Sequence, residues 1–474
     1  MACASDVFVV PSSETPTLAF ALDPSVSPVQ AGDTIELASG SPILGVYEVR
    51  VRDLTIRSAA GMRATLDGDG DGPILVVPEA GSGLVIEGID LRNAVSTGDG
   101  GAVRVGGPGF DTATFAAVDC GFFDNGSGDD GGAVYVGSLD QASFTGCVFE
   151  DNRTLPPVGG KDGGAIAVEG GGVTVRDSVF RRNDAINFGG AIALIGADGL
   201  VERCVIEDNE GSQGGGVGLQ QNSGLIMRDS RIVSNDAGSV GGGVLITGSN
   251  DLTLLERCLI DGNTSAGTGG GLVLTLCTSE VRQCVIVNNT AQIDGGISTD
   301  TRFCGPLVVG CTIIGNQSAS GAGGVGGDDE TVVESCIVRG NSSPQVSMSV
   351  APYSNIESGL ATDPTVIDAD PLFVDAASGD YRLTALSPCI DAGDATRYST
   401  SSVEPFDFDS LPRLVDDLPT PDTGLTLVGL AVDIGAHEFQ DPPRPACPAD
   451  QNFDGELTPA DFTAWIINFN AGCD

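Results

Sequence analysis

Short runs of alternating apolar and polar residues, separated by glycine, recur along most of the chain. In "CVIEDNEGSQGGGVGL" (204–219), Cys204 and Ile206 alternate with Val205 and Glu207 before glycines lead into the next apolar run. Such alternation over a few residues is typical of a strand with one buried face. The pattern predicts that Cys204 and Ile206 face inward and that Val205 and Glu207 face outward.

The same arrangement repeats at a nearly fixed spacing. An apolar residue stands two positions after Cys or Ser, and Asn stands five positions after it, as in "CVFEDN", "SVFRRN" and "CTIIGN". A degenerate copy, "GIDLRN", precedes them. The repeat asparagines are Asn93, Asn125, Asn152, Asn183, Asn209, Asn235, Asn263, Asn289, Asn316 and Asn341. A period of roughly 25–31 residues indicates a solenoid.

The repeat units predict strands rather than helices. They are rich in Val and Ile, and the chain contains 69 glycines, which disfavour helices through their backbone entropy. We expect each unit to hold about three short strands and to form one rung of a parallel β-helix, with about ten or more rungs of roughly 26–27 residues. The fold class expected is therefore an all-β solenoid.

The repeated Cys, Asn and Gly residues have an architectural interpretation. A small Cys or Ser fits a tight inner column of stacked rungs. Asn at a corner tolerates a left-handed backbone and can hydrogen-bond to the neighbouring rungs. Glycine allows the tight turn into the next strand.

Two short motifs resemble those of a known family. "GGAV" begins at Gly100 and Gly131, "GGAI" begins at Gly163 and Gly189, and "FEDN" and "FRRN" begin at Phe149 and Phe180. Paired motifs of this kind resemble the repeats of bacterial polymorphic outer-membrane proteins. The resemblance implies a right-handed parallel β-helix and a surface-displayed protein with a role in adhesion.

The segments around the repeats suggest a modular chain. "DPLFVDAASGDYRLTALSPCIDAGD" (370–394) and "VDIGAHEF" (432–439) resemble the terminal segment of bacterial secreted β-helix proteins, which precedes varied surface anchors. The predicted organisation is an N-terminal cap with the first rungs (1–84), β-helix repeats (85–350), a C-terminal cap region (351–440), a Pro-rich linker (441–448) and a small calcium-binding module (447–474).

Charge narrows the possible partners. The formal net charge is −43, from 65 acidic and 22 basic residues, and Lys161 is the only lysine. Such a surface repels nucleic acids and anionic membranes. No apolar run reaches 18 residues, so no membrane span is predicted. "MACASDVFVV" lacks the pattern of a signal peptide. We nevertheless expect a secreted or cell-surface protein, because of the acidic composition and the resemblance.

The 13 cysteines fall into classes. Seven occupy the repeat position and are expected to be small buried thiols. Cys277 and Cys304 each stand 12 residues before a repeat asparagine, so they are expected to stack in adjacent rungs and form a disulfide. Cys447 and Cys473 bracket the last segment and form a second predicted pair. No partner is assigned to Cys3 or Cys389.

The segment "DQNFDGELTPAD" (450–461) has the spacing of a calcium loop. Its oxygen ligands for Ca²⁺ are expected from Asp450, Asn452, Asp454, Glu456, Thr458 and Asp461. The sharp turn falls on Gly455. The loop and the following apolar helix resemble one half of a bacterial dockerin. The resemblance implies an anchoring role, with a cohesin-like or cell-envelope partner.

Two functions remain open. The first is adhesion, display or extracellular assembly, with a glycan or protein bound by the β-helix. The second is a polysaccharide lyase or glycoside hydrolase, for which weak candidates surround the longest step between repeats. These candidates are Asp151, Arg153, Lys161, Asp162 and Arg182. The only histidine, His437, lies in a cap-like segment and is interpreted as structural.

Overall fold

The computed structural model is an all-β right-handed parallel β-helix of about 11 turns. It describes residues 6–440 except 14, 16, 79–82, 107–112, 138–139, 157–160, 249–252, 277–278, 301–304, 328, 349, 359, 361–362, 399–405, 418–419 and 428–429. Within these residues, helical structure is confined to α1 (Leu18–Leu22) and the 3₁₀ segments η1 (Ala376–Ser378) and η2 (Ala395–Tyr398). No helix of this described part is long and apolar enough to cross a membrane.

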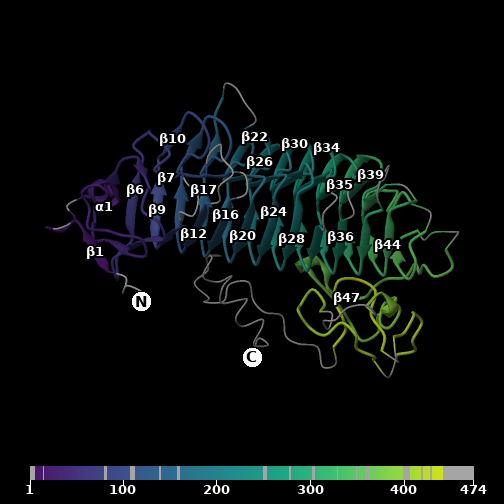
Figure 1. Cartoon of the computed structure of the whole chain (residues 1–474). Coiled ribbons are helices and arrows are strands. Elements are labelled where there is room, and N and C mark those ends of the chain that lie inside the picture. Colours follow the sequence, from purple (N-terminus) through teal and green to yellow (C-terminus); the bar gives the residue numbers. More distant parts are fainter. Residues whose placement is uncertain are drawn as a thin grey trace. The chain divides into compact units, whose positions relative to one another are not determined.

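The chain divides into two compact units. Unit 1 comprises Met1–Ile226 and Ile232–Asp251, and unit 2 comprises Met227–Arg231 and Leu252–Asp474. Strands β28 (Gly224–Arg228) and β29 (Arg231–Val233) contain residues of both units. Each unit is built from parallel sheets A to D, in which the neighbour of each strand is the equivalent strand of the next rung (Figure 1).

The strands of unit 1 follow one another in spatial order within each sheet. Sheet A contains β1 (Val7–Val10), β2 (Thr34–Leu37), β5 (Leu54–Ser58), β8 (Gly83–Glu87), β12 (Thr114–Val118), β16 (Gln141–Thr145), β20 (Gly172–Arg176) and β24 (Asp198–Glu202). Sheet B contains β3 (Ile43–Leu44), β6 (Ala64–Asp67), β9 (Ile89–Arg92), β13 (Gly121–Phe123), β17 (Val148–Glu150), β21 (Val179–Arg181) and β25 (Val205–Glu207). Sheet C contains β4 (Tyr47–Glu48), β7 (Leu75–Val77), β11 (Val103–Val105), β15 (Val134–Val136), β19 (Ile166–Glu169), β23 (Ile192–Ile195), β27 (Val217–Gln220) and β31 (Val244–Thr247). Sheet D contains β10 (Val95–Ser96), β14 (Gly126–Ser127), β18 (Arg153–Thr154), β22 (Asp184–Phe188), β26 (Glu210–Gln213) and β30 (Asp236–Val240).

Unit 2 repeats the four-sheet plan and adds an antiparallel hairpin. Its sheet A contains β32 (Thr253–Glu256), β36 (Ser279–Arg282), β40 (Leu307–Val309) and β44 (Val332–Glu334). Its sheet B contains β33 (Leu259–Asp261), β37 (Val285–Val287), β41 (Thr312–Ile314), β45 (Ile337–Arg339) and β46 (Asn355–Ile356). Its sheet C contains β35 (Leu272–Thr275), β39 (Ile297–Asp300) and β43 (Val325–Gly326), and its sheet D contains β34 (Thr264–Thr268), β38 (Thr290–Ile293) and β42 (Gln317–Ser320). The hairpin pairs β47 (Phe373–Asp375) with β48 (Asp380–Leu383).

A full rung contains four strands, not the three expected from the alternation. The additional strand belongs to sheet D and follows the repeat asparagine, as β26 does after Asn209. Its sequence, "EGSQ", has no apolar alternation. The pairing of stacked rungs, rather than local propensity, makes this segment a strand.

The predicted inward and outward positions are confirmed. Cys204 and Ile206 are fully buried, whereas Val205 and Glu207 are partly exposed. The equivalents of Ile206 in the three preceding rungs are phenylalanines whose rings stack along the solenoid. The ring centroids of Phe122 and Phe149 are 4.5 Å apart and nearly parallel. This spacing matches the separation of paired strands, so the interior is a continuous apolar column.

The repeat asparagines form a buried hydrogen-bonded ladder. The Nδ2 and backbone N–H of Asn183 both donate to Asn209 Oδ1 at 2.9 Å, and Asn183 Nδ2 also donates to the carbonyl of Phe149 at 3.0 Å. The left-handed residue is the one before the asparagine, such as Asp208 with φ +55°, rather than the asparagine itself. The side-chain amide therefore satisfies buried groups while its predecessor makes the corner.

The first copy is shifted by one residue from the predicted register. Leu91 pairs with Phe122, which places Ala94 rather than Asn93 opposite Asn125. Asn93 is exposed and occupies the left-handed corner with φ +54°. The ladder therefore begins at the backbone N–H of Ala94, which donates to Asn125 Oδ1 at 3.2 Å.

The last rung ends the ladder with a glutamine. The Nδ2 of Asn341 donates to Gln345 Oε1 at 2.9 Å, and Gln345 Nε2 donates to the Asn341 carbonyl at 3.0 Å. The side chain of Gln345 therefore supplies the acceptor that a further asparagine would have supplied.

The cysteines at the repeat position are buried thiols, as predicted. Among the described residues, the cysteines form no disulfide. Burial raises the pKa of Cys120 to about 11 and that of Cys204 to about 12. Cys120 Sγ donates to the carbonyls of Val118 and Ile86 at 3.3 and 3.5 Å. These thiols are therefore protonated packing groups rather than nucleophiles.

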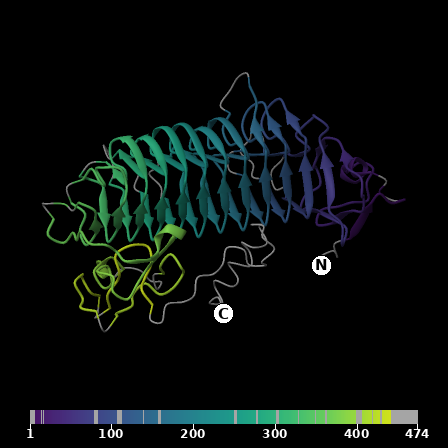
Figure 2. The ribbon, with the colours of Figure 1, turned by 180° about the vertical axis from the view of Figure 1, so that it is seen from behind.

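The described residues from β47 to residue 439 form a cover over sheet B within unit 2 (Figure 2). Phe373 and Tyr381 pack against outward-facing residues of β37, and Ile434 packs against Ile337. Backbone contacts add to this packing, because the N–H of Ala436 donates to Thr312 Oγ1 at 3.0 Å. We call this segment the C-terminal cover.

Candidate functional site

Two of the five catalytic candidates meet at the surface of unit 1. Arg182 Nε lies 2.9 Å from Asp151 Oδ1, and its Nη2 lies 3.0 Å from Asp151 Oδ2. The guanidinium also contacts Glu150. All three side chains are at least partly exposed. Arg153 is exposed on β18. Burial raises the pKa of Asp184, and the positive charge of Arg153 offsets part of that increase.

Lys161 and Asp162 have a different set of partners. Lys161 is buried with φ +63°, and its ammonium donates to the carbonyl of Gly128 at 2.7 Å and to that of Leu155. Asp162 is also buried, and its Oδ1 accepts from Asn187 Nδ2 at 2.7 Å. The five candidates therefore form two groups. Asp151, Arg182 and Arg153 are on the surface, whereas Lys161 and Asp162 lie in a buried turn.

A second group of carboxylates lies nearby in unit 1. Asp99, Asp130 and Asp162 occupy equivalent positions in consecutive rungs, because the N–H of Gly100 donates to the Asp130 carbonyl and that of Gly131 to the Asp162 carbonyl. The signal in the sequence is an aspartate before the first three "GGA" motifs. Oxygen atoms of Asp99, Asp129 and Asp130 all lie within 4.8 Å of one another. We call these three residues the aspartate cluster.

Burial and mutual repulsion change the protonation of the aspartate cluster. Burial raises the pKa of Asp130 to about 7, with Asp162 and Asp129 adding to the effect, and burial also raises the pKa of Asp99. Tyr135 Oη donates to Glu169 Oε2 at 2.7 Å beside them. A carboxyl group that is half protonated near neutral pH is suited either to proton transfer or to a shared cation.

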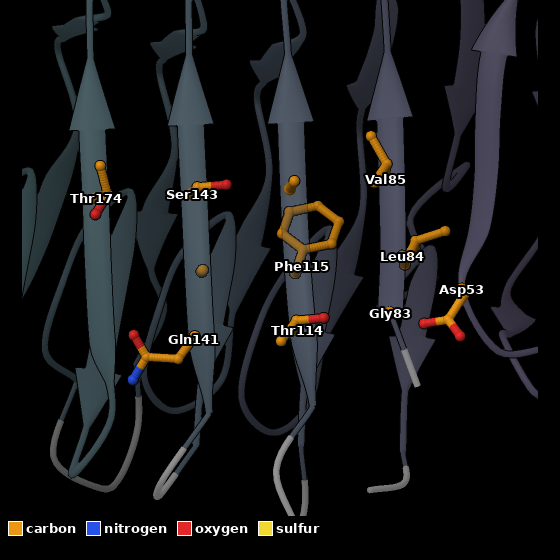
Figure 3. Close-up of a pocket in the computed structure, with 11 residues that line it drawn as sticks. Asp53, Gly83, Leu84, Val85, Thr114, Phe115, Gln141, Ser143 and Thr174 are labelled. Carbon is orange, nitrogen blue, oxygen red and sulfur yellow. The ribbon is translucent and has the colours of Figure 1, made fainter. Parts of the chain in front are cut away.

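The outer surface of sheet A in unit 1 contains a shallow groove of about 470 Å³ (Figure 3). Its floor crosses β8, β12, β16 and β20. The outward-facing lining side chains are small or neutral: Val85, Thr114, Ala116, Gln141, Ser143 and Thr174. Among the described lining residues, Asp53 is the only ionisable one. The groove therefore offers hydroxyl, amide and apolar groups with a single charge at one end.

Two glycines leave space in the groove that a larger side chain would fill. A Cβ at Gly83 would lie 2.9 Å from Asp53 Oδ1, and a Cβ at Gly172 would lie 2.6 Å from Gln141 Oε1. Each glycine leaves room for the polar side chain of a neighbour. The sequence did not reveal this groove, because its residues come from repeats 27–31 residues apart.

His437 is buried in the C-terminal cover of unit 2. Its Nδ1 lies 3.0 Å from Asp409 Oδ2, and its ring lies edge-on to Phe408 with centroids 5.2 Å apart. Burial lowers the pKa of His437. The nearby carboxylates of Asp409 and Asp407 raise it by more than burial lowers it, so the net shift is upward.

Several predicted features lie outside the described residues. These are the calcium loop at 450–461, the linker at 441–448, and the cysteines of both predicted disulfides, together with Cys3. They remain predictions from the sequence.

The family model described as "right handed beta helix region" matches residues 111–269. The matched stretch covers about a third of the chain, including most of sheet A that forms the groove. The chain has no match among curated proteins.

Three solved structures are similar over much of their length. They are a pectate lyase, Pel9A (11% identity, TM-score 0.32, 92% of this chain and 97% of that one), and XylC in complex with xylose (11%, 0.39, 78% and 87%). The third is the A-module of the mannuronan C-5 epimerase AlgE6 from Azotobacter vinelandii (15%, 0.32, 62% and 89%). At these identities and TM-scores, the likeness does not extend to a site or an activity.

Proposed function

We propose that this chain is a surface-displayed, non-catalytic β-helix protein that binds a neutral polysaccharide along the sheet A groove of unit 1. The observation that carries the proposal is the lining of that groove. Hydroxyl and amide groups from Thr114, Gln141 and Ser143 lie on adjacent strands beside small apolar groups. Such surfaces suit sugar rings, which present hydroxyl groups at their edges and apolar C–H groups on their faces.

The charge of the groove favours binding over cleavage. Hydrolysis of a glycosidic bond by acid–base chemistry usually requires two carboxyl groups about 5–9.5 Å apart. Asp53 is the one carboxylate among the described lining residues. A net charge of −43 also disfavours uronic-acid polymers, so the proposed ligand is uncharged.

The tail supplies the proposed attachment. The spacing of Asp450, Asp454 and Asp461 supports a Ca²⁺-binding loop, and its dockerin-like character supports a cohesin-like or cell-envelope partner. In this proposal the protein acts outside the cell, where millimolar Ca²⁺ and extended glycans are both present.

The groove is tested by filling it. Ser143→Trp places an indole in the groove, whereas Thr145→Trp places one on the same face of β16, two residues beyond the lining. We expect the first variant to lose binding to neutral glycans by at least about tenfold, while the second binds like the wild type and neither unfolds. Equal binding by all three proteins on a glycan panel would exclude the groove.

A second function is favoured by the aspartate cluster. Its carboxylate oxygens, within 4.8 Å of one another, approach the roughly 5–5.5 Å separation of retaining glycosidases. If the chain cleaves glycans, new reducing ends should appear, and Asp130→Asn should abolish them. Unsaturated ends that depend on Asp151, Arg153, Lys161 or Arg182 would instead support a lyase. Glycan binding without any product would support the non-catalytic proposal.

A further inference from the structure

The C-terminal cover contains a group of side chains with the composition of a transition-metal site. Asp407 and His437 are buried, and the side chain of Asp409 is 24% exposed. One carboxylate oxygen from each aspartate and one ring nitrogen of His437 lie within 4.8 Å of one another. The three residues come from two segments about 30 residues apart, which the fold brings together.

The geometry points to a Zn²⁺ ion bound by Asp407, Asp409 and His437, with a fourth position open to water on the exposed side of Asp409. Zinc–oxygen and zinc–nitrogen bonds of about 2.0–2.2 Å place neighbouring ligands of a tetrahedral ion about 3.4 Å apart. The 3.0 Å between His437 Nδ1 and Asp409 Oδ2 is close to that edge. An imidazole with two carboxylates favours Zn²⁺ over Ca²⁺ or Mg²⁺.

Hydrogen bonds already hold the proposed ligands in place. Asp407 Oδ1 accepts from the N–H of Leu411 at 2.8 Å, and Oδ2 accepts from the N–H of Glu438 at 2.9 Å. Each oxygen keeps a second lone pair for a metal. Phe408 packs on the His437 ring, and its N–H donates to the carbonyl of Ala436 at 2.8 Å. These hydrogen bonds orient the Asp407 carboxylate, and the contact with Phe408 holds the His437 ring.

The interior around the proposed site is short of positive charge. Asp407, Asp433 and Glu438 are buried within the cover, and the buried guanidinium beside them is that of Arg413. Arg413 Nε lies 3.5 Å from Glu438 Oε2, while Glu438 Oε1 has no hydrogen-bond partner. Arg382, another nearby cation, is paired with Asp380 and also interacts electrostatically with Asp409. Buried carboxylates in excess over cations are costly, and a divalent ion would offset that cost.

The bound ion would fasten the cover to the β-helix of unit 2. Next to His437, Ala436 donates to Thr312 Oγ1, and Gly435 N–H donates to the carbonyl of Ser335 at 2.8 Å. Joining the loop at Asp407 to this segment would therefore stabilise the part of the cover that contacts sheet B. The proposed role is structural and independent of glycan binding.

The test uses the full chain, freed of metal with a chelator and then dialysed against ZnCl₂. Mass spectrometry of bound metal is expected to show one zinc fewer per chain in His437→Gln and in Asp409→Asn than in the wild type. The double variant Asp450→Ala, Asp454→Ala alters only the tail and should keep that zinc. Thermal unfolding should shift upward with zinc in the wild type and in the tail variant, but not in His437→Gln.

A second measurement does not depend on variants that fold. His437 is the only histidine of the chain, so ¹⁵N-histidine labelling gives the signals of one imidazole. We expect zinc to move its Nδ1 resonance in the wild-type protein, with saturation at about one equivalent. An unchanged imidazole spectrum, or equal zinc content in the wild type and a folded His437→Gln variant, would overturn the proposal.

Discussion

The outer face of sheet B is charged and partly exposed in unit 1 but apolar and buried in part of unit 2. In unit 1 its outward positions include Glu207 and Arg181, which form a partly exposed ion pair with a shortest N–O distance of 2.6 Å. In unit 2 the position equivalent to Glu207 is Val287 in β37, and Val287 and the outward-facing Val285 of the same strand are each only 2% exposed. The inward positions are the same in kind, since Ile206 and Ile286 are both fully buried.

The difference shows that one repeat can serve two environments. The inner residues specify the rung, and the outer residues specify what lies against it. In unit 1 the outer residues face solvent, whereas in unit 2 the C-terminal cover packs on them through Tyr381 and Phe373. The outward valines of β37 are therefore buried by this contact, whereas the outward Val205 of β25 is partly exposed.

The largest expected effect comes from a charge placed on that surface. Val285→Glu would bury a carboxylate beneath the cover, at an expected cost of about 3–5 kcal/mol in the free energy of unfolding. Val205→Glu makes the same change at the equivalent, partly exposed position of unit 1 and should cost less than about 1 kcal/mol. Denaturant unfolding measures both. Equal losses would remove the distinction between covered and open strands.

The asparagine ladder should not distinguish the units. Asn209→Ala in unit 1 and Asn289→Ala in unit 2 each leave buried donors and a carbonyl without partners, and each should cost about 3 kcal/mol. Asn93→Ala, outside the ladder, should cost less than about 1 kcal/mol. A marked difference between the two ladder variants would mean that the interiors differ as well as the surfaces.

Ion pairs of the two units should also differ in stability, although by less than the outer valines do. In unit 2, Arg397 donates to Glu334, which is 1% exposed, and Glu334→Gln should cost about 2 kcal/mol because a buried, charge-assisted interaction is weakened. In unit 1, Glu207→Gln should cost about 0.5 kcal/mol and even less in high salt. Thermal unfolding at low and high ionic strength checks both. A salt-sensitive Glu334 variant would contradict its assignment to a buried pair.

The last expected effect is the pH dependence of the cover. Burial raises the pKa of Asp391 to about 7, with repulsion from Asp416 and Asp422 adding to it. The folded state therefore binds more protons than the unfolded state between about pH 4 and 7, so the contribution of this group to stability is largest below that window and falls as the pH rises through it. Hydrogen exchange in the cover, expressed as protection relative to the intrinsic exchange rate at each pH, should be less protected at pH 8 than at pH 5.

Two variants separate this effect from general charge. Asp391→Asn keeps an oxygen acceptor for the N–H of Asp417 and should reduce the change in exchange between pH 5 and pH 8. The exposed Asp375→Asn should leave that change as in the wild type. An unaltered pH profile in Asp391→Asn would assign the effect to other groups.

The repeat period predicted the fold because each rung is specified locally. Cys or Ser, then an apolar residue, then Asn are all read within six residues, and stacking requires every rung to place them alike. The one error in register, at Asn93, arose because asparagine also suits the left-handed corner that precedes the ladder position. The fourth strand was missed because pairing, not alternation, creates it.

The candidate sites were only partly predictable. Arg182 and Asp151 meet as an ion pair, but the ammonium of Lys161 contacts backbone carbonyls, which no spacing in the sequence indicates. The aspartate cluster had a signal before the "GGA" motifs, whereas the groove had none. Small residues on adjacent strands look unremarkable until the strands are placed side by side.

The sequence by itself determined the β-helix, its inner columns and its buried thiols, because these depend on contacts between identical positions of neighbouring repeats. Only the tertiary structure decided which outer surfaces stay open. The cover contacts the β-helix of unit 2 through residues far apart in the chain, such as Gln283 with Tyr398 and Thr312 with Ala436. These contacts form when the C-terminal segment folds back onto the β-helix, and the repeat pattern in the sequence does not predict where it folds back.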